Sequence, residues 1–316
     1  MRSRSCSHLL TVLLVAAAPI GAQPFAAPRD SATRVLMSRL ATLSADSMEG
    51  RRTATPGSAR ARAWLVQLLT AMGAKPLGAS YEQPFRLRPR GAGTSDSITG
   101  VNIVARIPGR SAAGRTLVMS AHYDHLGVRN GEIFNGADDD ASGCIVLLTV
   151  AEQLLHDPPQ HDVILAFFDA EELGLQGARA FVNAPPVPLA SVAANLNLDM
   201  VARQDAGALW VAGTSHYPFL KAVAESASKA SGVAVRFGHD TKDLKPGDDW
   251  TNSSDHGVFH GKGIPFLYLG VEDHPDYHKS GDDADKVDPA FYAKTVTFAG
   301  TLLRALDRAV PQFPVR

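Results

Sequence analysis

The loop at residues 122–143 contains the side chains best suited to bind metal ions. It reads HYDHLGVRNGEIFNGADDDASG, so imidazoles and carboxylates lie close together in the chain. It follows an apolar run at 116–121 and precedes a helical pattern at 141–155. Imidazole and carboxylate are common ligands of zinc-type ions. Because open α/β sheets place their sites in loops that leave buried strands, the sequence predicts that this loop supplies part of a two-metal hydrolytic site.

Polar side chains also follow the other strongly apolar runs. Asp169, Glu171 and Glu172 follow a second buried run, Asp199 ends a third, and His278 lies in the loop after the last. Helix capping or a solvated loop end explains any one of these residues. It does not explain why polar groups repeatedly end the most hydrophobic segments. Since the carboxyl ends of parallel strands share one sheet edge, these residues are expected to converge there.

Strands and helices are expected to alternate along most of the chain. Near-continuous apolar runs and helical periodicity predict an α/β fold, a three-layer α/β/α sandwich around a mixed, mostly parallel sheet. The expected strands are 101–107, 116–121, 162–168, 194–200, 208–211, 233–237 and 265–271. The expected helices are 32–43, 60–72, 141–155, 173–182, 217–231 and 289–310. Residues 76–100 are expected to be irregular or to form a hairpin.

The first 22 residues have the pattern of a secretory signal peptide. Arg2 and Arg4 precede the apolar stretch 8–18, and small residues follow at 19–22. The apolar stretch is shorter than the ~20 residues that span a bilayer, which disfavours a membrane anchor. We therefore expect export to the periplasm or the extracellular space, with no stable membrane association after removal of the signal.

Composition indicates a globular enzyme rather than a nucleic-acid-binding protein. The 316 residues are 45% hydrophobic and 20% charged, which suffices for a large core. A net charge of −1 argues against nucleic acid or an anionic membrane as the main partner. Cys6 lies in the expected signal peptide, so Cys144 remains as a lone cysteine, expected to be buried in a helix and not in a disulfide.

The motifs, taken together, resemble the co-catalytic dizinc exopeptidases of metallopeptidase family twenty-eight, which includes aminopeptidase Y and secreted bacterial leucyl aminopeptidases. The resemblance extends from about residue 44 to the C-terminus. It implies a zinc exopeptidase fold for 23–316. We expect a single domain without an inserted protease-associated domain, because residues 76–100 are too few to form one. It rests, in the family's order, on HYD at 122–124, GADDDASG at 136–143, FDAEELGL at 168–175, LDM at 198–200, SDH at 254–256 and YH at 277–278.

The resemblance implies a centre of two Zn²⁺ ions per chain, bridged by Asp139. The residue types suit this role, because two cations roughly 3.5–4 Å apart need a shared anionic ligand. The family also suggests a cis peptide bond between Asp139 and Asp140. The five implied metal ligands are His122, Asp139, Glu172, Asp199 and His278.

Three further residues receive catalytic roles from the resemblance. Glu171 would be the general base that takes a proton from the attacking water and passes it to the leaving amine. Asp124 would orient the ring of His122. Tyr277 would stabilise the oxyanion, although an exposed loop tyrosine is nearly as good an interpretation.

Nearby polar residues are expected to support the site or to lie on the surface. Asp138 and Asp140 would cap the next helix or bond the loop backbone. Asp282 would orient His278, and His125 either approaches the metals or contacts solvent. Asp255 and His256 would support the ligands, and residues 240–250 would line the cleft. The histidines expected at the surface are His216, His239, His260 and His274.

The leading functional interpretation is an exported aminopeptidase that acts on peptides with a free N-terminus. A carboxypeptidase or dipeptidase is the nearest alternative, since the metal centre does not fix which terminus is bound. Glutaminyl cyclases share the fold but work with one zinc and lack the first histidine, so His122 argues against that branch. A non-catalytic binding relative would have lost ligands, and here all five are present. The oligomeric state stays open.

Overall fold

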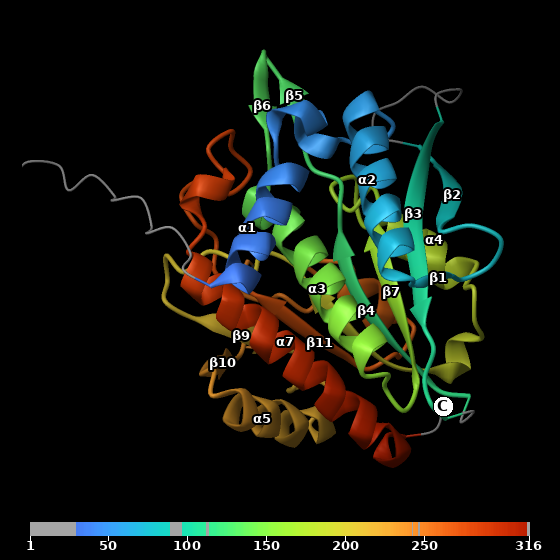
Figure 1. The fold of residues 1–316 in the computed structure, drawn as a ribbon. Coiled ribbons are helices and arrows are strands. Elements are labelled where there is room, and N and C mark those ends of the chain that lie inside the picture. The colour runs from blue at the N-terminus through green and yellow to red at the C-terminus, as the bar shows by residue number, and fades with distance from the viewer. Residues whose placement is uncertain (1–29, 89–96, 112–113, 242, 246, 315–316) are drawn as a thin grey trace, which may run out of the picture.

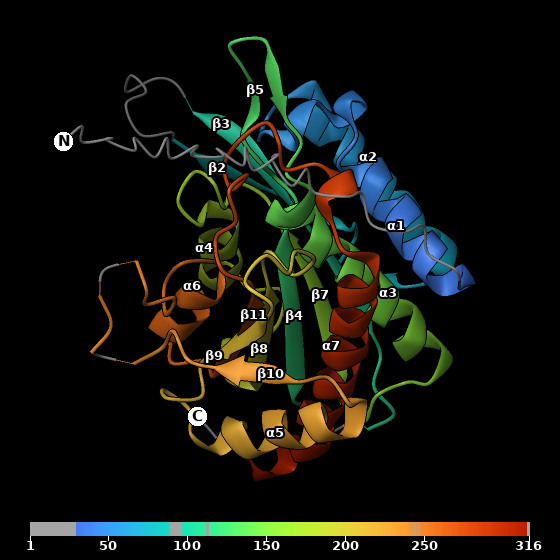
Figure 2. The same ribbon diagram turned by 90° about the vertical axis from the view of Figure 1, so that its left-hand side faces the viewer.

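The computed structural model describes residues 30–88, 97–111, 114–241, 243–245 and 247–314. The expected signal peptide at 1–22 lies outside these residues. A mixed β-sheet runs through the described part, with helices on both of its faces (Figures 1 and 2). This arrangement confirms the predicted three-layer α/β/α sandwich. In the described residues, no helix has the length and apolar character needed to cross a membrane.

The centre of the sheet consists of the most apolar segments of the chain. Strands β7, β4, β8 and β11 lie side by side and parallel, and antiparallel strands flank them. The order across the sheet is β1-β3-β7-β4-β8-β11-β9-β10, and β2 also pairs with β3. The strands are β1 Lys75–Pro76, β2 Glu82–Leu87, β3 Ile98–Ile107, β4 Thr116–His122, β7 Asp162–Phe168, β8 Val192–Leu198, β9 Leu209–Ala212, β10 Val235–Phe237 and β11 Phe266–Gly270.

Alternating side chains of each central strand pack against different helix layers. In β4, Leu117 and Met119 join the larger core, whereas Val118 joins the core on the opposite face. Helices α4 Gln176–Asn183 and α6 His256–Gly261 cover that opposite face. The larger core lies beneath α1 Ser31–Leu43, α2 Pro56–Met72, α3 Gly143–His156, α5 Phe219–Ser231 and α7 Pro289–Ala309.

Local signals explain where the main helices begin and end. The Thr55 side chain accepts the N–H of Ser58 at the start of α2, and Gly73 ends that helix in the left-handed conformation. Asp288 accepts the N–H groups at the start of α7. Cys144 is buried in α3, as predicted.

Sequence periodicity misses a short hairpin that projects beyond the sheet (Figure 1). Its strands are β5 Gly127–Arg129 and β6 Glu132–Phe134, which pair antiparallel. Asn130 and Gly131 connect them, both with positive φ, as type I′ turns require. Each strand has only three residues, so no alternating pattern could develop. The Asn-Gly pair was the available signal.

Candidate metal centre and catalytic cavity

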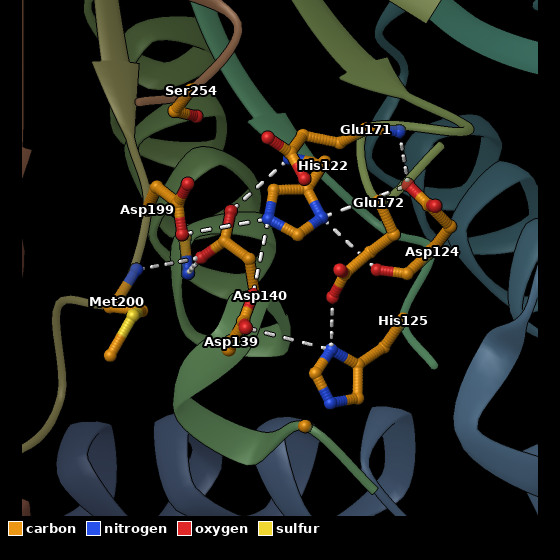
Figure 3. Close-up of polar contacts among 12 residues, drawn as sticks. His122, Asp124, His125, Asp139, Asp140, Glu171, Glu172, Asp199, Met200 and Ser254 are labelled. Atoms are coloured by element: carbon orange, nitrogen blue, oxygen red, sulfur yellow. Dashed lines mark hydrogen bonds and ion pairs between the residues drawn. The ribbon is translucent and has the colours of Figure 1, made fainter. Parts of the chain in front are cut away.

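The segments that carry the predicted site residues meet at one edge of the parallel strands. His122 is the last residue of β4, and the turn with Glu171 and Glu172 follows β7. Asp199 directly follows β8, and His278 lies in the loop after β11. These four strands are parallel neighbours, so their carboxyl ends lie together. Figure 3 shows the side chains around His122 at this edge.

The carboxylate of Asp139 lies between two imidazoles. Its Oδ1 atom is 3.3 Å from Nε2 of His122, and its Oδ2 atom is 3.2 Å from Nε2 of His278. Oδ1 of Asp199 lies 3.5 Å from Nε2 of His122. Oε2 of Glu172 lies 3.4 Å from Nε2 of His278. Each imidazole therefore faces one oxygen of Asp139 and one oxygen of a second carboxylate.

This donor set suits two divalent metal ions. Each half offers a ring nitrogen and carboxylate oxygens, which are ligand types of zinc, and Asp139 reaches both halves. The carboxylates favour positive charge at this site. Burial opposes protonation of His278, yet the carboxylates of Asp139 and Glu172 raise its pKa to about 10. Despite its own burial, Asp139 has a pKa well below the usual value because imidazoles surround it.

Side-chain oxygens hold the backbone of residues 136–143, which contain Asp139 and which we call the bridging turn. The Asp140 carboxylate accepts the N–H groups of His122 and Gly143 at 3.1 and 2.9 Å. The Asp138 carboxylate accepts an N–H from the loop after β8 at 2.7 Å. Both flanking aspartates therefore bond the backbone, which was one of the two roles expected for them. The Asp139–Asp140 peptide bond is cis, as predicted.

Asp282 does not orient His278, and that prediction is wrong. Its carboxylate accepts the N–H groups of Asp138 and Asp139 at 3.0 Å each. A backbone turn, closed by the N–H of Asp282 and the carbonyl oxygen of Lys279 at 3.4 Å, redirects the chain between the two residues. Asp282 therefore holds the bridging turn, while His278 faces other carboxylates.

Asp124 lies beside both His122 and Glu171. Its Oδ1 atom is 3.7 Å from Nδ1 of His122 and accepts the N–H of Glu171 at 3.0 Å. Its own backbone carbonyl oxygen lies closer to the same Nδ1, at 3.0 Å. The backbone of Asp124 is thus the nearer partner of the His122 ring, and its carboxylate fixes the start of the Glu171–Glu172 turn.

A cavity of about 600 Å³ opens over this cluster. Glu171 and Tyr277 line it together with the residues just described. Burial raises the pKa of Glu171 well above its usual value; His122 opposes the shift and Asp255 adds to it. The ring of Tyr277 stacks against that of His278, with 4.0 Å between centroids. The apolar part of the wall comprises Leu173, Leu175, Met200, Trp250, Tyr268 and Val271.

The expected contribution of residues 240–250 to this cavity is found in part. Trp250 and Gly247 line it. The Trp250 ring stacks on His239 at 3.7 Å between centroids, so His239 is a packing partner of the cavity wall and not a simple surface residue. Asp255 and His256 are fully buried. Nε2 of His256 lies 2.7 Å from the carbonyl oxygen of Trp250.

Two other histidines lie deeper than the sequence suggested. His125 is buried, and its Nδ1 lies 2.8 Å from Oε1 of Glu172, which excludes the alternative of solvent contact (Figure 3). His274 was expected at the surface, but it is buried with Nε2 3.4 Å from Oδ2 of Asp138. The prediction for His274 is wrong because its loop packs back beneath the bridging turn.

Sequence reasoning also missed Arg51. It is completely buried. Its guanidinium donates to the backbone carbonyls of Tyr123, Asn135 and Gly136, and to that of Leu43 at the end of α1. The first three carbonyls lie at the two ends of the loop that separates His122 from the bridging turn. No periodic pattern in the sequence predicts a buried arginine outside a regular helix or strand. The burial of Arg51 could therefore not be predicted.

The sequence matches Peptidase family M28 over residues 102–302. Aminopeptidase YwaD of Bacillus subtilis is 33% identical over 181 residues, which are 54% of this chain and 36% of that protein. The solved aminopeptidase from Aneurinibacillus sp. strain AM-1 is similar with a TM-score of 0.70 and 15% identity, covering 86% of this chain and 93% of that one. Porphyromonas gingivalis glutaminyl cyclase is similar with a TM-score of 0.69 and 22% identity, covering 87% and 98%.

The family match and the similar solved structures support different conclusions. The chain spans 11%, 23% and 36% of the length of three curated relatives that it matches. The solved structures share its fold. The family match covers well over half of the chain and contains every motif from β4 to the loop after β11. The chain therefore belongs to Peptidase family M28, as its motifs predicted.

Proposed function

We propose that the protein is a zinc-dependent exopeptidase that removes N-terminal residues from peptides. The observation that carries this proposal is Asp139, whose two carboxylate oxygens face His122 and His278 at 3.3 and 3.2 Å. A cavity with one further carboxylate, that of Glu171, lies directly beside them. The five proposed ligands of two Zn²⁺ ions are His122, Asp139, Glu172, Asp199 and His278.

Bound zinc would acidify water towards a pKa of ~7 and polarise the scissile carbonyl. Glu171 would accept the proton of the attacking water at its carboxylate and deliver it to the leaving amine. Asp124 would keep Glu171 in place by accepting its N–H, at 3.0 Å. The hydroxyl of Tyr277 would donate a hydrogen bond to the developing oxyanion. Burial raises the pKa of Tyr277, so its hydroxyl stays protonated at neutral pH and remains a donor.

The charge of the cavity favours the amino end of a peptide. Besides the proposed ligands and Glu171, the cavity wall includes the carboxylate of Asp273. Bound zinc would offset the charge of the ligand carboxylates, but Glu171 and Asp273 are not proposed ligands. Their carboxylates would attract an ammonium group and repel a terminal carboxylate. Glutaminyl cyclase is the second candidate, because a solved cyclase shares the fold. His122, which completes the donor set with Asp199, favours the peptidase.

A substrate panel tests this proposal. Aminoacyl p-nitroanilides and free peptides should be hydrolysed, their N-acetylated forms should not, and a chelator should stop the reaction until zinc is restored. Hydrolysis of N-blocked peptides from the carboxyl end would show a carboxypeptidase instead. Conversion of N-terminal glutamine to a ring without hydrolysis of other residues would show a cyclase.

We also propose that the chain is exported after cleavage near residue 22. The charged, apolar and small-residue order of 1–22 supports this. Expression of the full chain in a bacterial host, followed by N-terminal sequencing of the periplasmic and extracellular fractions, tests it. Intact Met1 on protein confined to the cytoplasm would contradict export.

A further inference from the structure

A second cavity, of about 430 Å³, adjoins the catalytic cavity. Leu175 lines both cavities, while Ser253 lines the first and its neighbour Asn252 lines the second. Residues of α4 and α6 line the second cavity. These two helices lie side by side in Figure 2. The rings of Phe181 and Phe259 hold these helices against each other, with 5.8 Å between centroids. A substrate that extends past Leu175 would therefore enter a preformed hollow.

The two cavities differ in the charged side chains that line them. The described lining of the second cavity includes no carboxylate, but it includes the cationic side chains of Arg179 and Lys262 and the amides of Asn183 and Asn252. Apolar residues complete it. In the catalytic cavity, zinc would offset the charge of the ligands Asp139, Glu172 and Asp199. The carboxylates of Glu171 and Asp273 remain there beside one cation, Arg52.

One hydrogen bond holds the Arg179 side chain, and its other donors are available. Arg179 lies in the first turn of α4, where its backbone N–H donates to the carbonyl oxygen of Leu175 at 3.0 Å. Its Nε atom donates to the carbonyl oxygen of Gly174 at 3.2 Å. Within the described residues, its two Nη atoms make no hydrogen bond or ion pair. A guanidinium fixed at Nε with free Nη atoms is arranged to bind an incoming carboxylate.

We propose that the second cavity binds the C-terminal carboxylate of short peptides whose N-terminal residue occupies the catalytic cavity. This inference rests on the proposed exopeptidase function. A short peptide carries an ammonium at one end and a carboxylate at the other, and the two adjoining cavities match that polarity. The amides and apolar residues of the second cavity suit the intervening backbone and side chains. The enzyme would thus favour short peptides with a free carboxyl end.

Peptides of two to five residues, each beginning with leucine and made as free acid and as C-terminal amide, test the inference. At one length or more, the free acid should have a KM about tenfold lower than the amide, with a similar kcat. The difference should shrink at high ionic strength, because both cations lie near solvent. Equal KM values for acid and amide at every length would overturn the inference.

Two variants and a control locate the effect. Arg179→Gln and Lys262→Gln should each raise KM for the free acids and leave the amides and leucine p-nitroanilide unchanged. Arg308→Gln removes an exposed cation of α7 and should change nothing. An acid preference that survives in the double variant would overturn the inference. An equally large decrease in KM when an amidated peptide carries an internal glutamate would also overturn the inference, because the cavity would then recognise an acidic side chain.

Leucine p-nitroanilide separates this inference from the proposed function. If the wild-type protein does not hydrolyse it with zinc present, the proposed function fails. If hydrolysis occurs but the acid preference is missing or ignores Arg179 and Lys262, only the assignment of the second cavity fails.

Discussion

The carboxylate of Asp140 accepts the backbone N–H of His122 at 3.1 Å. Its other oxygen accepts the N–H groups of Gly143 at 2.9 Å and of Met200 at 3.3 Å. One side chain therefore ties together the end of β4, the bridging turn and the segment after β8. Each of these segments carries a proposed metal ligand. The positions of the ligands thus depend on a carboxylate that is assigned no metal.

Asp140→Ala is expected to weaken zinc binding without removing a proposed metal ligand. The buried N–H groups would lose their acceptor, at a cost of about 1–3 kcal/mol in stability. Zinc affinity should fall about 10- to 100-fold, as is usual when a supporting partner of a ligand is lost. Asp140→Asn keeps one oxygen and should fall between wild type and alanine. Chemical denaturation and competitive zinc titration measure both effects; wild-type affinity in the alanine variant would contradict them.

The positions of several proposed ligands were predictable because they follow a strong local signal in the sequence. His122 and Asp199 end continuous apolar runs, and a parallel sheet aligns such ends. His274, His125 and Asp282 were placed wrongly or left open because they lie in loops, where no period relates sequence to burial. Their contacts arise from the way the loops after β4 and β11 pack on each other. The buried position of Arg51 depends on the same packing.

Arg51→Met is expected to destabilise the fold strongly. Four backbone carbonyls lose their donor, and methionine fills the space without replacing any hydrogen bond. We expect a loss of about 3–5 kcal/mol in the free energy of unfolding, measured by urea denaturation. Arg51→Lys should recover part of it. Arg52→Met, at the exposed neighbour, should change stability by less than about 0.5 kcal/mol. Equal effects at Arg51 and Arg52 would refute the proposed role.

Glu171→Gln should abolish turnover and leave the metal in place. An amide cannot accept the proton of the attacking water, so kcat should fall about 10²- to 10⁴-fold. Because Glu171 is not a proposed ligand, the variant should retain as much zinc as the wild type by elemental analysis. Glu225→Gln, on the exposed side of α5, is the matched control. A variant that loses both zinc and activity would indicate a ligand instead of a base.

Removal of metal should destabilise the protein, and one ligand variant should reveal two sites. Without cations, the carboxylates of Asp139, Glu172 and Asp199 face each other around the imidazoles. At zinc concentrations about 1,000 times Kd, each bound ion adds about 4 kcal/mol to the free energy of unfolding, so chelation should lower Tm by about 10 °C per ion. Elemental analysis should find two zinc ions in the wild type and one in His122→Ala. A single ion in the wild type would contradict the two-metal proposal.

His256 should make the fold sensitive to acid. It is fully buried, and burial, aided by His260 and His216, lowers its pKa to about 3, against 6.5 for an exposed histidine. Between these values the unfolded chain takes up a proton that the folded protein excludes. Stability should therefore fall as the pH drops, by about 1.4 kcal/mol per pH unit between about pH 6 and pH 4.

His256→Gln isolates this contribution, because the glutamine amide can still donate to the carbonyl of Trp250 but does not titrate. Urea denaturation from pH 7.5 to pH 4.5 gives the difference in unfolding free energy between wild type and variant at each pH. The wild type should lose about 2.6 kcal/mol relative to the variant over this range, since other titrating groups affect both proteins alike. His156→Gln, at the exposed end of α3, should leave the pH profile unchanged. Parallel profiles for wild type and His256→Gln would mean that His256 is protonated in the folded protein, in conflict with its burial beside Trp250.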